Sequence, residues 1–202
     1  MSREREEAMA VMQHETTIAE AADRLSKELP RHRVEILQGR LTVTPPADGE
    51  HALTLSWLTE RFFEAGAKKA GLRYLQGIGI WLPTGPTDYA VPDFALVSKD
   101  FLGFKGRNNC YSPEVFRLIV EVTSSNWSDD LGPKVDSYAK ADVPFYVIAD
   151  RRHDEVVVCR DPRNGTYRLR TSHKRGTSIT VPEYVGVTLE LPVDLLLDGD
   201  QE

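Results

Sequence analysis

The sequence predicts an α/β fold in which a mixed β-sheet core is flanked by helices and extended by additional antiparallel strands. Three observations predict it. The run FRLIVEVT at 116–123 is almost continuously apolar, which is typical of a strand buried on both faces of a sheet. A helical pattern and the strand-like segment FYVIAD follow this run, and the later segments alternate apolar with polar residues.

The composition is that of an ordinary soluble globular protein. Its 202 residues, 41% of them hydrophobic and 28% charged, suit one domain, since single domains commonly contain about 100–200 residues. We expect the polar residues 1–14 to be flexible and residues 15–202 to form that domain. The charged N-terminus lacks a signal-peptide core, and no apolar run approaches the roughly 20 residues that span a bilayer. We therefore expect a cytoplasmic protein with no membrane association.

Charge and cysteine content argue against two classes of protein. The formal charge of −6 argues against a protein that coats nucleic acid through a general positive field, because phosphate contacts dominate that affinity. It does not exclude an enzyme whose acidic site recruits a divalent cation. Cys110 and Cys159 form no CxxC pair and have no histidine at zinc-ligand spacing, so we expect no structural zinc site.

The first expected elements are a helix and a β-hairpin. Thr17 and Glu20 form a T-x-x-E capping box at the start of an amphipathic helix that Pro30 ends. The stretch RVEILQGRLTVTPP then alternates apolar and polar residues around Gln38–Gly39, which predicts two short strands joined by a tight turn. Glu35 lies in the first of these strands.

A longer helix is expected from about Gly49 to Ala70, closed by Gly71. Its apolar residues recur at three- and four-residue intervals, and we expect this helix to make the largest single contribution to the core. These apolar residues are Leu53, Trp57, Leu58, Phe62 and Phe63.

Strands and a crossover helix follow. The segment LRYLQGIGIWLP is split by Gly77, and Asp93 opens the next strand in VPDFALVS. Glu121 interrupts the apolar run FRLIVEVT. The segment SDDLGPKVDSYAKADV begins with helix-start residues and precedes FYVIAD, so Glu121 lies on a strand beside a right-handed crossover. The segments EVVVCR, TYRLRTS, TSITVPE and VTLELP predict an antiparallel extension of this sheet.

Glu121 is the most informative residue for chemistry. Burying an ionised carboxylate is very costly unless a metal or a positive partner compensates it, so its place in LIVEV demands a partner. A structural pair with arginine or lysine, or an outward-facing edge position, is the alternative. Asp93 could project from a neighbouring strand end, and the two carboxylates with the Val122 carbonyl would suit Mg²⁺ or Mn²⁺. Such a metal can activate water and stabilise charge on phosphate.

Four further residues are candidates for the same site. Lys134 lies in the first turns of the crossover helix, where its ammonium could reach back to the Glu121 strand, or it could be a solvated lysine. Tyr138 follows one helical turn later, and Glu35 could add a third carboxylate. His51 stands at the start of the long helix, where a position facing solvent is slightly favoured.

Several motifs resemble those of the Uma2 family of restriction-endonuclease-like proteins, which belongs to the PD-(D/E)XK superfamily. The resemblance covers roughly residues 15–192 and includes the hairpin segment and the helix beginning near His51. The motifs are PD at 92–93, EVTSS at 121–125, DDLGPK at 129–134 with Tyr138, and ADVPFYVIAD at 141–150.

This resemblance implies a restriction-endonuclease-like fold and a role for each candidate residue. Asp93 and Glu121 correspond to the metal-binding carboxylates and Glu35 to the acidic residue of the first motif. Lys134 corresponds to the helix-borne lysine, and Tyr138 matches a frequent tyrosine of the same helix. The sequence departs from the pattern D…ExK because Thr123 stands where a lysine usually follows Glu121, so Lys134 must take that role.

Two functions follow as hypotheses. The first is an Mg²⁺-dependent endonuclease that hydrolyses DNA phosphodiester bonds. It is predicted to be a homodimer because cutting both strands of a duplex usually calls for two sites. The second is a catalytically silent nuclease-fold protein that serves as a binding or regulatory module. The segments KGRNNC at 105–110 and RTSHKRG at 170–176 could touch phosphates or be ordinary solvated loops.

Overall fold

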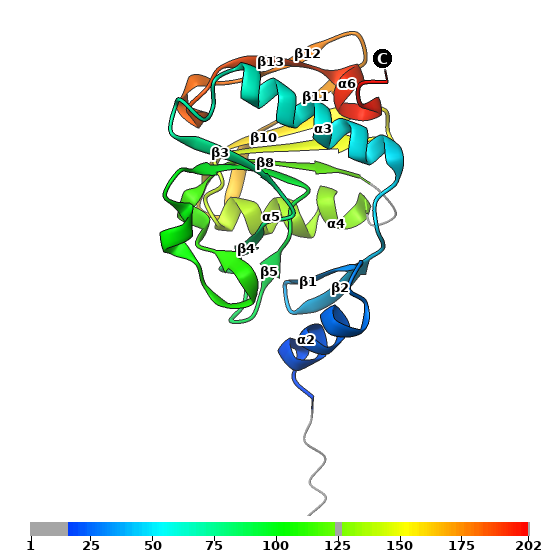
Figure 1. Ribbon diagram of the computed structural model, residues 1–202, viewed down its shortest axis with the longest axis vertical. Helices are drawn as coiled ribbons and strands as arrows, with labels where there is room; N and C mark the ends of the chain where they lie inside the picture. Colours follow the sequence, from blue (N-terminus) through cyan, green and yellow to red (C-terminus); the bar gives the residue numbers. More distant parts are fainter. Residues whose placement is uncertain (1–15, 124–126, 202) are drawn as a thin grey trace, which may run out of the picture.

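A central β-sheet separates two layers of the molecule (Figure 1). The computed structural model describes residues 16–123 and 127–201, so the predicted flexible segment 1–14 lies outside the described residues. Within those ranges the sheet has six strands in the spatial order β11, β10, β9, β8, β6, β3. They are β11 (Thr166–Lys174), β10 (Glu155–Arg163), β9 (Phe145–Asp150), β8 (Phe116–Val122), β6 (Phe94–Ser98) and β3 (Leu72–Gln76).

β8 and β9 are parallel neighbours, while the other adjacent pairs of this sheet are antiparallel. Their connection contains two helices, α4 (Trp127–Leu131) and α5 (Pro133–Lys140), where the sequence predicted one. Gly132 interrupts the helix with φ −127° and ψ −92°. Pro133 can then begin α5 because the first helical position needs no N–H bond. The strand–helix–strand unit is confirmed, with this break.

One face of the central sheet is covered by α3 (Gly49–Glu64), α6 (Val193–Asp198) and a hairpin (Figure 1). The hairpin pairs β12 (Ser178–Val181) with β13 (Leu189–Pro192). The prediction that these two strands extend the central sheet is therefore wrong. Their buried side chains, such as Ile179 and Leu191, belong instead to the hydrophobic cluster between α3, α6 and the sheet, so burial drives them onto its face.

Helix α3 ends at Glu64, well before the predicted end near Ala70. Gly66 has a φ of 74°, a left-handed conformation that glycine adopts without a steric cost, and it ends the helix. Leu53 and Phe63 are 41% and 67% exposed, so the expectation that they lie in the core is also wrong. A helix buries one stripe, and here that stripe contains Leu55, Trp57, Leu58 and Phe62.

The opposite face of the sheet packs against α5 and a second, smaller sheet. Among the described residues this sheet has the strand order β2, β1, β5, β4, β7, and α2 (Ile18–Glu28) lies beside β1 and β2 at one end of the molecule (Figure 1). The strands are β1 (Arg33–Leu37), β2 (Arg40–Thr44), β4 (Gly79–Trp81), β5 (Tyr89–Ala90) and β7 (Cys110–Tyr111). Short 3₁₀ turns are η1 (Phe101–Phe104), η2 (Arg107–Asn109), η3 (Pro113–Val115) and η4 (Glu183–Val185).

The local signals near the N-terminus are confirmed. The Thr17 side chain accepts a hydrogen bond from the Glu20 N–H, and the Glu20 carboxylate accepts one from the Thr17 N–H, which completes the capping box of α2. Gln38 and Gly39 have φ values of 52° and 72°, as a two-residue type I′ turn between β1 and β2 requires. No helix in the described ranges is long and apolar enough to cross a membrane.

Candidate active site

Asp93 and Glu121 lie side by side. Asp93 immediately precedes the first residue of β6, and Glu121 lies on β8. The two strands pair with Phe94 opposite Val120, which makes Asp93 and Glu121 neighbours. Since Phe94 and Val120 face the α3 side, the alternation along each strand turns both carboxylates toward α5. The Val122 N–H donates to Asp93 Oδ2 at 2.8 Å, and the Asp93 N–H approaches Glu121 Oε2 at 3.3 Å. Both carboxylates are buried.

Lys134 and Tyr138 reach Glu121 from successive turns of α5. Lys134 Nζ lies 2.9 Å from Glu121 Oε1, and the Tyr138 hydroxyl donates to the same oxygen at 2.8 Å. Both side chains are buried, because residues four apart share one helix face and this face packs on the sheet. The alternative of a solvated lysine is therefore wrong, whereas the expected approach of Lys134 to the Glu121 strand is observed.

Two further carboxylates surround the same ammonium group. Lys134 Nζ lies 3.4 Å from Glu35 Oε1 and 3.1 Å from Asp130 Oδ1. Glu35 is fixed on β1 by the Val91 N–H, which donates to it at 2.7 Å. The structure thus brings the predicted residues together in one buried cluster. Asp130, which sequence reasoning missed, could have been found from its position four residues before Lys134.

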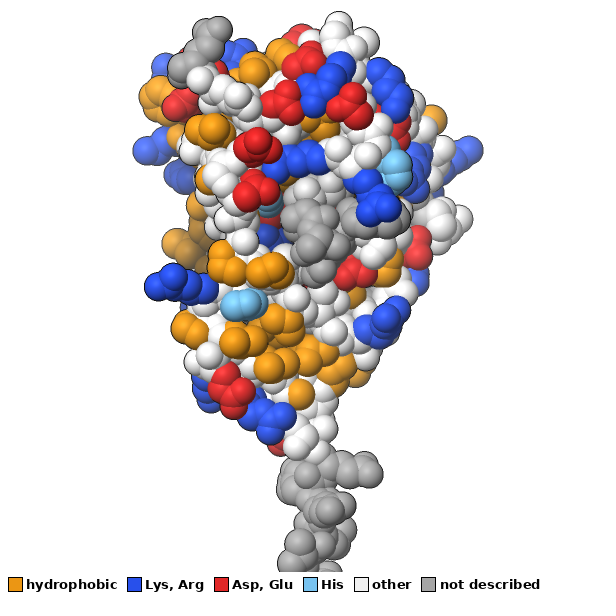
Figure 2. Space-filling model, turned by 90° about the vertical axis from the view of Figure 1, so that its right-hand side faces the viewer, with side chains coloured by type: hydrophobic (Ala, Val, Ile, Leu, Met, Phe, Trp, Pro, Cys, Tyr) orange, Lys and Arg blue, Asp and Glu red, His pale blue; other side chains and the backbone are white. Residues whose placement is uncertain are grey.

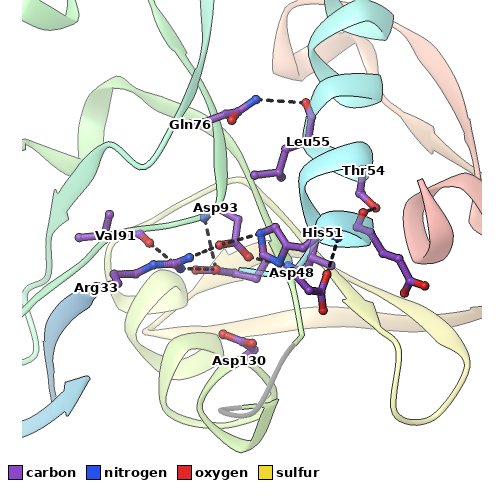
Figure 3. Close-up of polar contacts among 12 residues, drawn as sticks. Arg33, Asp48, His51, Thr54, Leu55, Gln76, Val91, Asp93 and Asp130 are labelled. Carbon is purple, nitrogen blue, oxygen red and sulfur yellow. Dashed lines mark hydrogen bonds and ion pairs between the residues drawn. The ribbon is translucent and has the colours of Figure 1, made fainter. Parts of the chain in front are cut away.

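Arg33 is the second cation of the cluster, and sequence reasoning missed it. Its guanidinium donates to Asp93 Oδ1 and to the Val91 carbonyl oxygen, and it lies 3.6 Å from Glu121 Oε2. Figure 3 shows Arg33 approaching Asp93 from β1 while His51 approaches it from α3. The period of two along a strand could have found Arg33, because it places this side chain on the same face as Glu35.

His51 also belongs to the cluster, although the sequence favoured a position facing solvent. It is buried, and its Nε2 lies 3.3 Å from Asp93 Oδ1. Asp48 caps α3 by accepting from the His51 N–H at 2.7 Å, and Arg151 Nη1 lies 3.4 Å from the same Asp48 oxygen. Within the described residues, His51 Nδ1 is the buried side-chain polar atom that lacks a hydrogen-bond partner.

Burial and neighbouring charges set the protonation of the cluster. Burial alone would raise the pKa of Asp93, but the hydrogen bond to His51 and the charge of Arg33 outweigh it and hold this pKa well below its usual range. Burial raises the pKa of Glu121, against the charge of Lys134. Burial would lower the pKa of Lys134, but Glu121, Glu35 and Asp130 raise it. Lys134 is therefore a fixed positive charge.

The chemistry of this cluster fits a hard divalent cation. Within the described residues, four carboxylates (Glu35, Asp93, Glu121 and Asp130) face the two permanent cations Arg33 and Lys134, so added positive charge would relieve their repulsion. The pocket between them has space of about 20 Å³ for small groups and is also lined by Val122 and His51. That space can hold about one water molecule, and its oxygen donors are those that Mg²⁺ and Mn²⁺ prefer.

Two carboxylates and a carbonyl form the expected donor set, so a cage of three or more acidic or histidine side chains is not required. Residues 16–123 and 127–201 contain no group of three or more His, Cys, Asp or Glu side chains arranged to hold a metal ion. Lys134 and Arg33 occupy the spaces between carboxylates that would otherwise repel one another. The fit to a cation therefore rests on the pair Asp93 and Glu121, beside Val122.

Comparison with known proteins identifies the family. Residues 19–194 match the Uma2 family, which is described as "Putative restriction endonuclease". The chain belongs to the Uma2 family. The family's description supports a nuclease function for its members, as the resemblance of the sequence motifs implied. No curated protein matches the chain.

A solved structure shares the fold of this Uma2 chain. It is described as a "putative nuclease belonging to DUF820 from Anabaena variabilis ATCC 29413" and superposes with a TM-score of 0.61 at 15% sequence identity. The match covers 81% of this chain and 89% of the other. The predicted α/β fold with a restriction-endonuclease-like core is thereby confirmed.

The contact between His51 and Asp93 gives a prediction for this Uma2 chain. Glutamine places an amide N–H near the position of Nε2, whereas asparagine reaches only the position of Nδ1. We expect His51→Gln to keep the affinity for Mn²⁺ close to that of the wild type. We expect His51→Asn to lower it by about tenfold to a hundredfold, as losses of groups that orient metal ligands do. Calorimetric titration of Mn²⁺ measures both, and equal losses in the two variants would contradict a role through Nε2.

Proposed function

We propose that this protein is a Mg²⁺- or Mn²⁺-dependent endonuclease that hydrolyses DNA phosphodiester bonds. The observation that carries the proposal is the contact between Lys134 and Glu121 beside Asp93, inside a buried cluster with an excess of carboxylates. Such a cluster is costly to bury, and a structural role alone needs fewer charges. The description of the Uma2 family supports the same class of reaction.

Each residue of the cluster has a proposed task in this reaction. Asp93 and Glu121, with the Val122 carbonyl, would hold the cation. When bound, this cation would act as a Lewis acid that polarises a phosphate oxygen and acidifies a nearby water. Lys134 keeps its proton and so stabilises negative charge that develops on the phosphate as water adds and the bond to the leaving oxygen breaks. Tyr138 holds Glu121 Oε1 in place.

Arg33 and His51 position Asp93 in this proposal. The guanidinium of Arg33 and Nε2 of His51 both approach Asp93 Oδ1, while the Val122 N–H holds Oδ2. The carboxylate is thus oriented by three donors from β1, α3 and β8. Such orientation lowers the cost of binding a cation, because the ligand is already ordered before the cation arrives.

DNA is the proposed substrate, and the protein is proposed to act in the cytoplasm as a homodimer with two clefts. The dimer follows from the need to cut both strands of a duplex and stays a prediction. The face containing the end of β8 carries acidic and basic side chains intermixed rather than a dense basic patch (Figure 2). Recognition of phosphate is therefore expected to depend on the cluster and its immediate surroundings more than on a general field.

A catalytically silent scaffold is the second candidate function. It is favoured by the satisfied state of Glu121, whose carboxylate already accepts from Lys134, Tyr138 and the Asp93 N–H. A binding module that kept the nuclease fold would show the same contacts without turnover.

The two functions are separated by metal binding and cleavage. For an endonuclease, calorimetric titration should show binding of Mg²⁺ or Mn²⁺ to the wild type, and the same sample should nick supercoiled DNA or cut single-stranded DNA only in the presence of the metal. Asp93→Asn should lose both properties, because the amide supplies no negative charge. Absence of metal binding and of cleavage in the wild type would leave the scaffold as the function.

A further inference from the structure

A groove adjoins the carboxylate cluster on the side of α2. It has a volume of about 410 Å³ and is lined by side chains of α2, β1 and the 108–109 loop. Arg33 lines both this groove and the pocket that holds Asp93 and Glu121. Val91 also lines the groove, and its carbonyl accepts from Arg33 at 2.9 Å while its N–H donates to Glu35 of the cluster. The groove therefore lies next to the cluster and shares Arg33 with it.

A second depression continues this groove away from the cluster. Its volume is about 430 Å³, and it shares Asp23 and Asn108 with the first. It is also lined by Trp81 and Arg107. We call the two depressions together the α2 groove.

The α2 groove contains side chains of the types that contact a polynucleotide backbone. Lys27 and Arg107 supply positive charge, Arg33 is paired with Asp93, and Asn108 and Asn109 supply amide donors. Asp23 is the acidic side chain among the residues that line it. The local charge is thus positive, opposite to the net charge of −6 of the chain. Lysine, arginine and amide side chains supply most contacts to phosphates and sugars in complexes with nucleic acid.

Trp81 adds an aromatic surface to this basic groove. Its indole packs edge-on against Tyr89, with the ring centroids 6.1 Å apart. A Cβ atom at Gly106 would come within 2.3 Å of Trp81 Nε1, so only glycine lets the 106–109 loop approach the indole this closely. Aromatic side chains within a basic groove are typical of sites for single strands, because an unpaired base can stack on them.

We propose that the α2 groove binds the single-stranded segment of DNA that flanks the phosphate in the carboxylate cluster. The backbone phosphates lie against Lys27 and Arg107, and an unpaired base stacks on Trp81. A duplex would not fit this role, since its bases are already stacked within the helix. Each depression has the volume of a site for a small molecule, which corresponds to on the order of one nucleotide. The inference rests on the proposed nuclease function.

The experiment measures binding without cleavage. A fluorescein-labelled oligodeoxynucleotide is titrated with the full-length protein in EDTA, once as a single strand and once annealed to its complement, and anisotropy reports the affinity. Wild type should bind the single strand at least about tenfold more tightly than the duplex. The double variant Lys27→Gln, Arg107→Gln should lower this affinity by about tenfold or more. It should also reduce the salt slope by about 1.4, because each phosphate contact on a single strand contributes about 0.7.

The matched control is Lys69→Gln, Arg168→Gln, which removes one exposed lysine and one exposed arginine outside the α2 groove. It should leave the affinity within about twofold of wild type. Equal losses in the groove variant and the control would overturn the inference, because the effect would then be one of net charge. Preferred binding of the duplex, or unchanged binding by the groove variant, would also overturn it.

A second measurement tests the stacking of a base on Trp81, which does not depend on the charge of the groove. Stacking of a base on Trp81 should quench tryptophan fluorescence when the unlabelled single strand is added, and Trp81→Phe should remove that part of the quenching. Quenching of equal size in Trp81→Phe would contradict the proposed stacking. A wild type that cuts DNA in Mg²⁺ but fails these binding tests would overturn this inference alone. A wild type that binds a single strand through the groove yet never cuts DNA would overturn the proposed function alone.

Discussion

Glu121→Gln is expected to abolish metal binding and to lower the rate of DNA cleavage by at least about a thousandfold, which corresponds to about 4 kcal/mol. Glu121 is the carboxylate that contacts both Lys134 and Arg33, the two cations of the cluster. Its Oε1 accepts from Lys134 and Tyr138, and its Oε2 lies near Arg33 and the Asp93 N–H. Glutamine keeps the size of the side chain but removes the charge that a divalent cation requires.

The measurement is calorimetric titration of Mg²⁺ and Mn²⁺, followed by incubation of the same samples with supercoiled and single-stranded DNA. Glu60→Gln is the matched control, because it makes the same chemical change at an exposed position of α3, and it should behave as wild type. Circular dichroism should show that the Glu121 variant remains folded, since Lys134 keeps its contacts with Glu35 and Asp130. Undiminished cleavage by Glu121→Gln would exclude this carboxylate from the reaction.

Lys134→Met is expected to destabilise the metal-free protein by about 3–5 kcal/mol, because it leaves buried carboxylates without their cation. Lys134 Nζ lies within 3.4 Å of Glu35 and closer still to Glu121 and Asp130. The same change should nearly abolish cleavage, since it removes the charge that is proposed to stabilise the phosphate. Methionine retains most of the buried apolar stem, so the loss of stability reports the charge rather than the volume.

We also expect Mg²⁺ to change the free energy of unfolding of this variant. Without the ammonium group, added Mg²⁺ should stabilise Lys134→Met more than it stabilises wild type, because a cation that binds the folded state shifts the unfolding equilibrium. Urea unfolding in EDTA and in Mg²⁺ measures both effects. Lys140→Met, an exposed lysine of the same helix, is the control and should change the free energy of unfolding little. A Lys134 variant with wild-type stability would show that the carboxylates do not need this charge.

The sequence by itself determined the local structure of this protein and most of the candidate residues. The capping box of α2, the turn at Gln38–Gly39 and the apolar run of β8 depend on neighbouring side chains and on backbone conformations that a short segment fixes. The apolar run around Glu121 indicated a buried carboxylate, with an outward-facing edge position as the alternative, and the structure buries it. The demand for a compensating partner followed from the cost of burying charge.

Only the tertiary structure decided which charges meet. Arg33 and His51 reach Asp93 from β1 and α3 because those elements pack beside the start of β6, and no short pattern in the sequence fixes that packing. The same applies to β12 and β13, whose alternation predicts strands but does not say which strand each will pair with. Periodicity records which side of an element is apolar. Pairing of distant elements depends on how their apolar faces are buried together, and that burial is a property of the whole fold.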